Sequence, residues 1–66
     1  MNPIHKVFFI ENMTKQDEIK IKSLLENDTR VNFSISSSTQ SISIKGTNDE
    51  IFTTKQLLKS EGYSVL

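Results

Sequence analysis

The sequence predicts an α+β fold in which two helices cover one face of a four-stranded antiparallel sheet. Two observations lead to this prediction. Two segments have the apolar period of a helix, and each begins with the spacing of a capping box. The segments around them either alternate apolar and polar residues or are rich in β-branched and aromatic residues, as strands are. The predicted order is strand, helix, strand, strand, helix, strand.

The first half of the chain contains a strand and a helix. Residues 4–10 are β-branched or aromatic with apolar side chains on both alternating faces, which is typical of a central strand. Thr14 and Asp17 then have capping-box spacing, with aspartate in place of the usual glutamate or glutamine. They predict a helix over residues 15–27. Its apolar face is formed by residues three or four positions apart, Ile21, Leu24 and Leu25.

The second half predicts a hairpin, a helix and a short strand. Residues 31–36 and 41–45 alternate apolar and polar side chains, so the hairpin should have one apolar and one polar face. A second capping box precedes a helix over residues 48–60. Gly62 should end this helix, and residues 63–66 should form the last strand. With short connections and right-handed crossovers, this order gives the ferredoxin-like βαββαβ arrangement, with one sheet face open.

Length and composition limit the classes of protein that fit. A chain of 66 residues has room for one domain, which we expect to span residues 1–66. Its eight basic and eight acidic residues are scattered and give a net charge of zero, so a concentrated basic face for nucleic acid is not expected. The absence of cysteine excludes disulfides and thiolate metal sites. No apolar run has the length of a signal peptide or a membrane span, so we expect a cytoplasmic protein without a membrane partner.

Several short motifs resemble those of the heavy-metal-associated domains, the fold of the copper chaperones and of the N-terminal domains of copper-transporting ATPases. Met13-Thr14 after the first strand resembles the family's Gly-Met-Thr, with Asn12 in place of the glycine. Leu58 through Gly62-Tyr63 resembles the closing signature of the family. The resemblance covers nearly the whole chain. It implies a ferredoxin-like fold and a role in metal handling by docking to partner proteins.

The chain departs from this family at the metal loop. In the family, Met-Thr is followed by Cys-x-x-Cys, whose thiolates hold Cu(I) or Zn(II). The corresponding positions here are Lys15 and Glu18, or Thr14 and Asp17 if the helix is aligned instead. None of these is a soft ligand, so residues 12–18 form a degenerate loop. We therefore expect no firmly bound cofactor, and at most weak Cu(I) or Zn(II) binding through non-thiolate ligands.

The remaining soft or borderline ligands are Met13, Met1 and His5. Met13 closes a strand and is expected in the core, whereas His5 is expected on the surface. A site would form there only if Met1 folded back beside His5. Asp17 and Glu18 diverge by about 100° on a helix, so they suit the helix dipole better than shared acid-base chemistry. With one histidine and two glycines, the chain has no catalytic or phosphate-binding constellation, and we expect that it is not an enzyme.

The open face of the sheet suggests a different function. If Phe8 and Ile10 point to the helices, Val7 and Phe9 point outward beside serines of the neighbouring strand, and they could bind a protein partner or form a weak homodimer. Tyr63 is a further candidate contact residue. Residues 6–13 also resemble the first-strand motif of RNA-recognition domains, but the matching strand carries no aromatic residue and no arginine. Two hypotheses therefore lead: metal handling through the degenerate loop or partner docking, and protein interaction through the open face. RNA binding is third.

Overall fold

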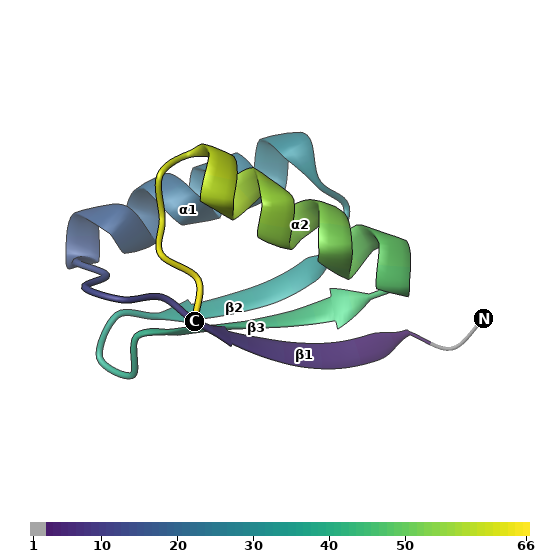
Figure 1. Ribbon diagram of the computed structural model, residues 1–66, viewed down its shortest axis with the longest axis horizontal. Coiled ribbons are helices and arrows are strands. Elements are labelled where there is room, and N and C mark those ends of the chain that lie inside the picture. Colours follow the sequence, from purple (N-terminus) through teal and green to yellow (C-terminus); the bar gives the residue numbers. More distant parts are fainter. Residues whose placement is uncertain (1–2) are drawn as a thin grey trace.

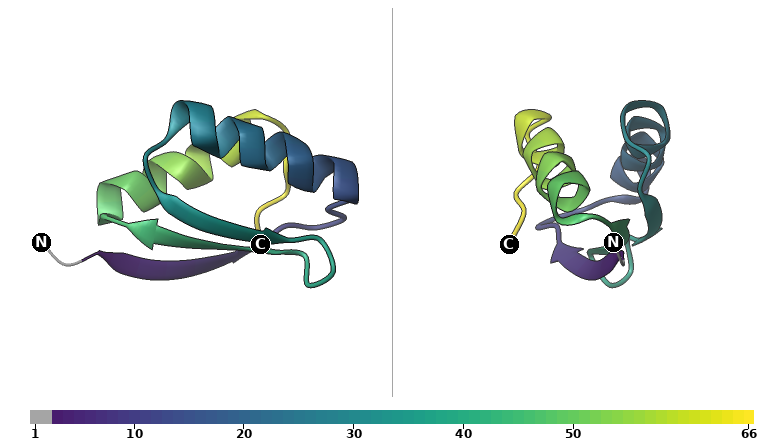
Figure 2. Two further views of the ribbon diagram at one scale, coloured as in Figure 1. Left: turned by 180° about the vertical axis from the view of Figure 1, so that it is seen from behind. Right: turned by 90° about the vertical axis from the view of Figure 1, so that its right-hand side faces the viewer.

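The structure, a computed structural model, describes residues 3–66 and has an α+β architecture (Figure 1). Three antiparallel strands form a sheet, and both helices lie on the same face of it (Figure 2). The elements, in chain order, are β1 (Ile4–Phe9), α1 (Lys15–Asp28), β2 (Asn32–Ser36), β3 (Ser41–Gly46) and α2 (Asn48–Ser60). The α+β class, both helices, the hairpin and the covered face are confirmed.

The strand order is β1-β3-β2, with β3 in the centre. The pairing register aligns residues of the three strands in rows across the sheet face that is turned away from the helices. These rows are His5, Lys45 and Asn32; Val7, Ser43 and Ser34; and Phe9, Ser41 and Ser36. Because side chains alternate along a strand, the residues between them point toward the helices.

The prediction of a fourth strand is wrong. The C-terminal segment runs beside β1 but pairs with it at one bridge, between Ile10 and Val65. The segment is short because the hydrogen bonds that cap α2 extend past its last residue: the Tyr63 N–H donates to the Leu58 carbonyl at 3.1 Å. The sheet therefore has three strands. β1 lies at the edge of this sheet, which corrects the expectation of a central strand.

Both helices begin at the predicted capping boxes. At α1, the Asp17 N–H donates to Thr14 Oγ1 at 3.1 Å, and the Thr14 N–H donates to Asp17 Oδ2 at 3.0 Å. Thr47 and Glu50 make the same reciprocal pair at α2, at 3.2 and 2.8 Å. Gly62 follows α2 with φ at +92°, the left-handed conformation predicted for it. Local sequence therefore determines where each helix begins and ends.

The core lies between the sheet and the two helices. Its buried hydrophobic side chains come from every helix and strand except β2, and from the adjoining loops: Phe8, Ile10, Met13, Ile21, Leu25, Val31, Ile42, Ile44, Ile51 and Leu58. Phe33 and Ile35 of β2 pack against this core but are only half-buried. Neither helix within residues 3–66 has the length and apolar character needed to cross a membrane.

Candidate functional site

The open sheet face carries two exposed apolar side chains on β1. Val7 is 46% exposed and Phe9 52% exposed, whereas Phe8 between them is 5% exposed. Their cross-strand neighbours on β3 are Ser43 and Ser41. The predicted orientation of β1 is therefore confirmed, and within residues 3–66 no element covers these side chains (Figure 2). We call Val7 and Phe9 the apolar pair.

A shallow hollow of about 350 Å³ lies on the same face, at the other end of β1. Its lining comes from all three strands: His5, Asn32, Phe33, Ser34, Ser43 and Lys45. His5 Nε2 forms a hydrogen bond with the Ser43 hydroxyl across the β1–β3 pair. His5 is therefore a surface residue, as predicted. The open face combines an apolar pair with hydroxyl, amide and basic groups.

Four side chains of residues 12–18, the loop for which metal binding was considered, make structural contacts. Met13 is 4% exposed and belongs to the core, as predicted. Thr14 and Asp17 form the capping box. The Thr14 backbone N–H, and after it the Thr14 side chain, hold the pKa of the Asp17 carboxyl below its ordinary value. Glu18 Oε1 accepts a hydrogen bond from the Ser37 N–H at 2.7 Å. Lys15 is exposed.

A second contact ties this loop to the β2–β3 turn and was missed by the sequence analysis. Gln40 Oε1 accepts a hydrogen bond from the Met13 N–H at 2.6 Å, and Gln40 Nε2 donates to the Met13 carbonyl and, at 2.8 Å, to the Ser37 carbonyl. Gln40 and Asn12 both have positive φ, at +56° and +60°. Asparagine tolerates this conformation better than most residues. The sequence carries no local signal for the Gln40 contact.

The contacts of residues 13–18 leave this loop without a cluster of metal ligands. Among residues 3–66, no group of three or more histidine, cysteine, aspartate or glutamate side chains is arranged to hold a metal ion. Met1 lies outside the described residues, and so does the predicted pairing of Met1 with His5. The loop has the chemistry of a helix cap tied to a hairpin turn.

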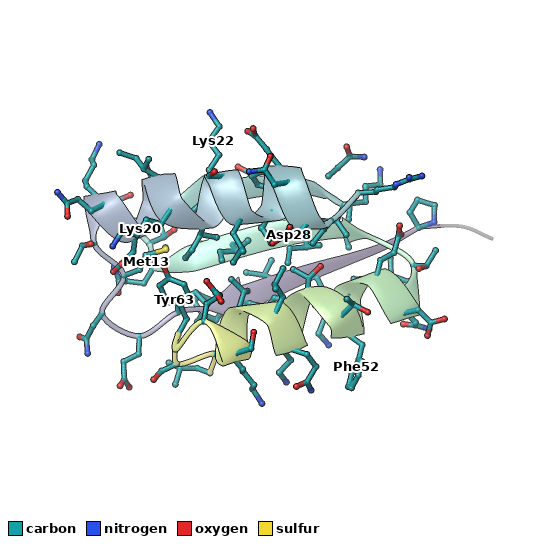
Figure 3. The ribbon with its side chains drawn as sticks, turned by 90° about the horizontal axis from the view of Figure 1, so that it is seen from above. Met13, Lys20, Lys22, Asp28, Phe52 and Tyr63 are labelled. Carbon is teal, nitrogen blue, oxygen red and sulfur yellow. The ribbon has the colours of Figure 1, made fainter. Side chains whose placement is uncertain are left out.

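Tyr63 lies on the helix side of the molecule, away from the apolar pair. It is half-buried in a groove between α1 and α2. Figure 3 shows Tyr63 and Lys20 toward the same end of the molecule. The groove is lined by residues of α1 and by the end of α2: Lys20, Ser23, Leu24, Asn27, Asp28, Glu61 and Tyr63 itself. Burial raises the pKa of the Tyr63 hydroxyl, and the carboxylates of Asp17 and Glu61 raise it further. The predicted interaction residues therefore lie on two separate surfaces.

The outer flanks of the helices carry two more exposed apolar side chains. Ile19 is 67% exposed and does not belong to the apolar face of α1. Phe52 is 63% exposed and points away from α1 (Figure 3). Phe52 was not among the predicted contact residues, although its position next to the buried Ile51 already indicated a different face of the helix.

Comparison of the chain with protein-family models, with curated proteins and with solved structures found no significant match. The resemblance to the heavy-metal-associated domains therefore stays a prediction.

Proposed function

We propose that this chain is a non-enzymatic protein-binding domain that contacts its partner through the open face of the sheet. The observation that carries the proposal is the apolar pair, Val7 and Phe9, which lies exposed on a face that neither helix covers. Exposed single apolar residues are common, but an aromatic and an aliphatic side chain on alternate positions of one strand make a continuous contact surface.

Energetics favour Phe9 as the centre of this contact. Burying a phenylalanine side chain contributes roughly 1.5–3 kcal/mol, and Phe9 is already about half removed from water, so it supplies part of that range. The neighbouring Ser41 and Ser43 are only half-exposed and offer hydroxyl groups around the apolar pair. An apolar centre with a polar surround is the usual anatomy of a binding site between proteins.

We also infer that the order of the elements is ferredoxin-like, with the C-terminal segment in the place of a fourth strand. The support is the bridge between Ile10 and Val65, which puts the C-terminal segment next to β1 and gives the order segment-β1-β3-β2. This arrangement keeps both helices on one side and leaves the other face free for binding.

Metal handling remains the alternative that the family resemblance implies, and no contact in the loop favours it. Asp17 and Glu18 each already use one carboxylate oxygen, in hydrogen bonds from the N–H groups of Thr14 and Ser37, and these bonds hold both side chains in structural roles. Amide NMR titration with Cu(I) and then Zn(II) under reducing conditions tests this alternative. Saturable shifts confined to residues 12–18 would support a metal site.

Photo-crosslinking tests the proposed function. A benzoylphenylalanine placed at Phe9 should capture a defined protein in cells, whereas the same group at Phe52, the matched exposed phenylalanine on α2, should not. The captured protein is then purified, and Phe9→Ser should weaken its binding about tenfold, equivalent to about 1.4 kcal/mol. Phe52→Ser should leave the affinity unchanged. Capture of RNA alone, or equal loss of affinity in both variants, would refute a protein site on the open face.

A further inference from the structure

We propose that a second copy of this chain docks on the free edge of β2, so that two three-stranded sheets join into one continuous sheet around a two-fold axis at Ser34. This inference does not depend on the proposed function. It uses a different surface, which is the strand edge and not the sheet face.

Within residues 3–66, the backbone of β2 has unpaired polar groups on the side away from β3. The Ile10 N–H donates to the Gln40 carbonyl at 2.8 Å, so Ile10 and Gln40 are a hydrogen-bonded pair. Along an antiparallel pair of strands, hydrogen-bonded and non-hydrogen-bonded pairs alternate. Alternation along the register then makes Ser34 and Ser43 a hydrogen-bonded pair, and it turns the N–H and C=O groups of Phe33 and Ile35 away from β3. Within the described chain, β2 has no strand on that side. These groups form a template for another strand.

The residues of β2 carry none of the features that usually keep a sheet edge from pairing with another strand. Natural sheets block their edges with charged side chains, proline or a covering segment. The other edge strand, β1, uses all three: Pro3 precedes it, Lys6 lies within it, and the C-terminal segment bonds to Phe9 and Glu11. β2 has the sequence Asn-Phe-Ser-Ile-Ser, with no charge and no proline. The C-terminal segment covers only the Phe9 end of β1, but within the described chain β2 has none of these three protections, so it is the less protected of the two edges.

The sequence of β2 is complementary to that of a second β2 strand paired antiparallel to it. Antiparallel pairing centred on Ser34 places Phe33 opposite Ile35 of the second copy, and Asn32 opposite Ser36. Since side chains alternate, the two apolar pairs fall on the helix side and the polar pairs on the open face. A register centred on Phe33 or on Ile35 would put the other of these two opposite a residue outside the strand. The centre at Ser34 is the one that matches both.

A groove between α1 and β2 lies above this edge. Glu18 and Lys22 line a groove of about 300 Å³ together with Phe33, Ser34 and Ile35. Lys22 points away from α2, toward this flank of the molecule (Figure 3). A strand added at this edge would cover this groove from the side. The exposed Ile19, a neighbour of Lys22 at i+3, would lose solvent contact on the same flank.

The axis has a functional consequence. It runs perpendicular to the joined sheet, so the helices of both copies stay on one side and both open faces lie on the other. The dimer would present two apolar pairs to a partner, and linked sites raise the effective affinity for a partner with two matching sites. Because a five-residue strand and one helix flank make a small interface, a weak and concentration-dependent dimer is expected.

Disulfide trapping tests the register, and the chain suits it because it contains no cysteine. In the proposed dimer, Ser34 faces itself as a pair without hydrogen bonds, with Cα atoms about 4.5 Å apart, which a disulfide can span. Ser34→Cys should oxidise to a covalent dimer at least about tenfold faster than Ser64→Cys, an exposed control at the C-terminal segment. Equal rates for the two variants would overturn the proposal.

Sedimentation gives the second test. Ser34→Lys puts like charges directly opposite each other and should abolish the dimer, while Ser64→Lys should not. Ser34 is exposed, so the circular dichroism of both variants should match that of the wild type. A wild-type protein that stays monomeric at about 1 mM would overturn the proposal. So would a dimer that survives Ser34→Lys but is lost in Phe9→Ser, because that result would place the contact on the open face.

Discussion

Gln40 holds both polar groups of the Met13 backbone, accepting a hydrogen bond from its N–H at 2.6 Å and donating one to its carbonyl. The two residues are 27 positions apart, and their contact connects the β2–β3 turn to the loop before α1. The Glu18 carboxylate reinforces this connection through the Ser37 N–H. The loop before α1 is therefore held by the hairpin.

Gln40→Ala should destabilise the protein by about 1–3 kcal/mol, because two hydrogen bonds to the Met13 backbone are lost at once. For a chain of 66 residues, total stability of roughly 3–10 kcal/mol is typical, so the loss should be plain in urea unfolding. Amide exchange at Met13 should accelerate in parallel.

Gln40→Gly is the control for backbone strain at this position. It removes the same side chain but also relieves the positive φ of +56°, so it should be more stable than the alanine variant by about 1 kcal/mol. If the exchange rate of the Met13 amide is the same in both variants and in the wild type, the hydrogen bonds to Gln40 do not hold the loop.

The sequence predicted the parts of the fold that depend on neighbouring residues. Both capping boxes occupy four consecutive positions, so the starts of α1 and α2 could be predicted to the residue. The edge position of β1 could not, because apolar residues on both faces of a strand do not say which strands lie beside it. The Gln40 contact could not be predicted either, since it joins two loops that are distant in sequence. Of the candidate site, the sequence predicted the outward direction of Val7 and Phe9 through simple alternation.

Phe8 and Phe9 form a matched pair for testing the two faces of β1. Phe8→Ala should cost about 3–5 kcal/mol, because it leaves a cavity in the core, whereas Phe9→Ala should cost less than about 1 kcal/mol. Urea unfolding of both variants measures the difference. If Phe8→Ala does not fold at all, the milder Phe8→Leu still allows the comparison. Equal losses for the two alanine variants would contradict the assignment of faces.

Acid should weaken the start of α1 through Asp17. The N–H and hydroxyl groups of Thr14 lower the pKa of the Asp17 carboxyl in the folded state, so folding favours the ionised form. This stabilisation is present above the unfolded pKa and disappears as pH falls through the lower, folded pKa, that is, below about pH 4.

Asp17→Asn isolates this effect from that of the other carboxyl groups. The asparagine keeps an oxygen for the Thr14 N–H but does not titrate, so the wild type should be the more stable protein at pH 7. The difference between the two should shrink at about pH 2–3. Thermal unfolding at both pH values measures it. A difference that stays constant with pH would mean that the capping carboxylate is not ionised preferentially in the fold.

Gly62 controls how the chain leaves α2 and reaches β1. Its φ is +92°, and an added Cβ would meet no atom within 4 Å, so Gly62→Ala tests backbone conformation without a steric clash. We expect a loss of about 1–2 kcal/mol, and a smaller one for Gly62→Asn, since asparagine adopts left-handed conformations more readily. The strain should loosen the C-terminal segment first, so exchange of the Leu66 amide, which donates to the Phe9 carbonyl at 2.8 Å, should rise before global unfolding. Unchanged stability and exchange in Gly62→Ala would show that the segment reaches β1 without the left-handed turn.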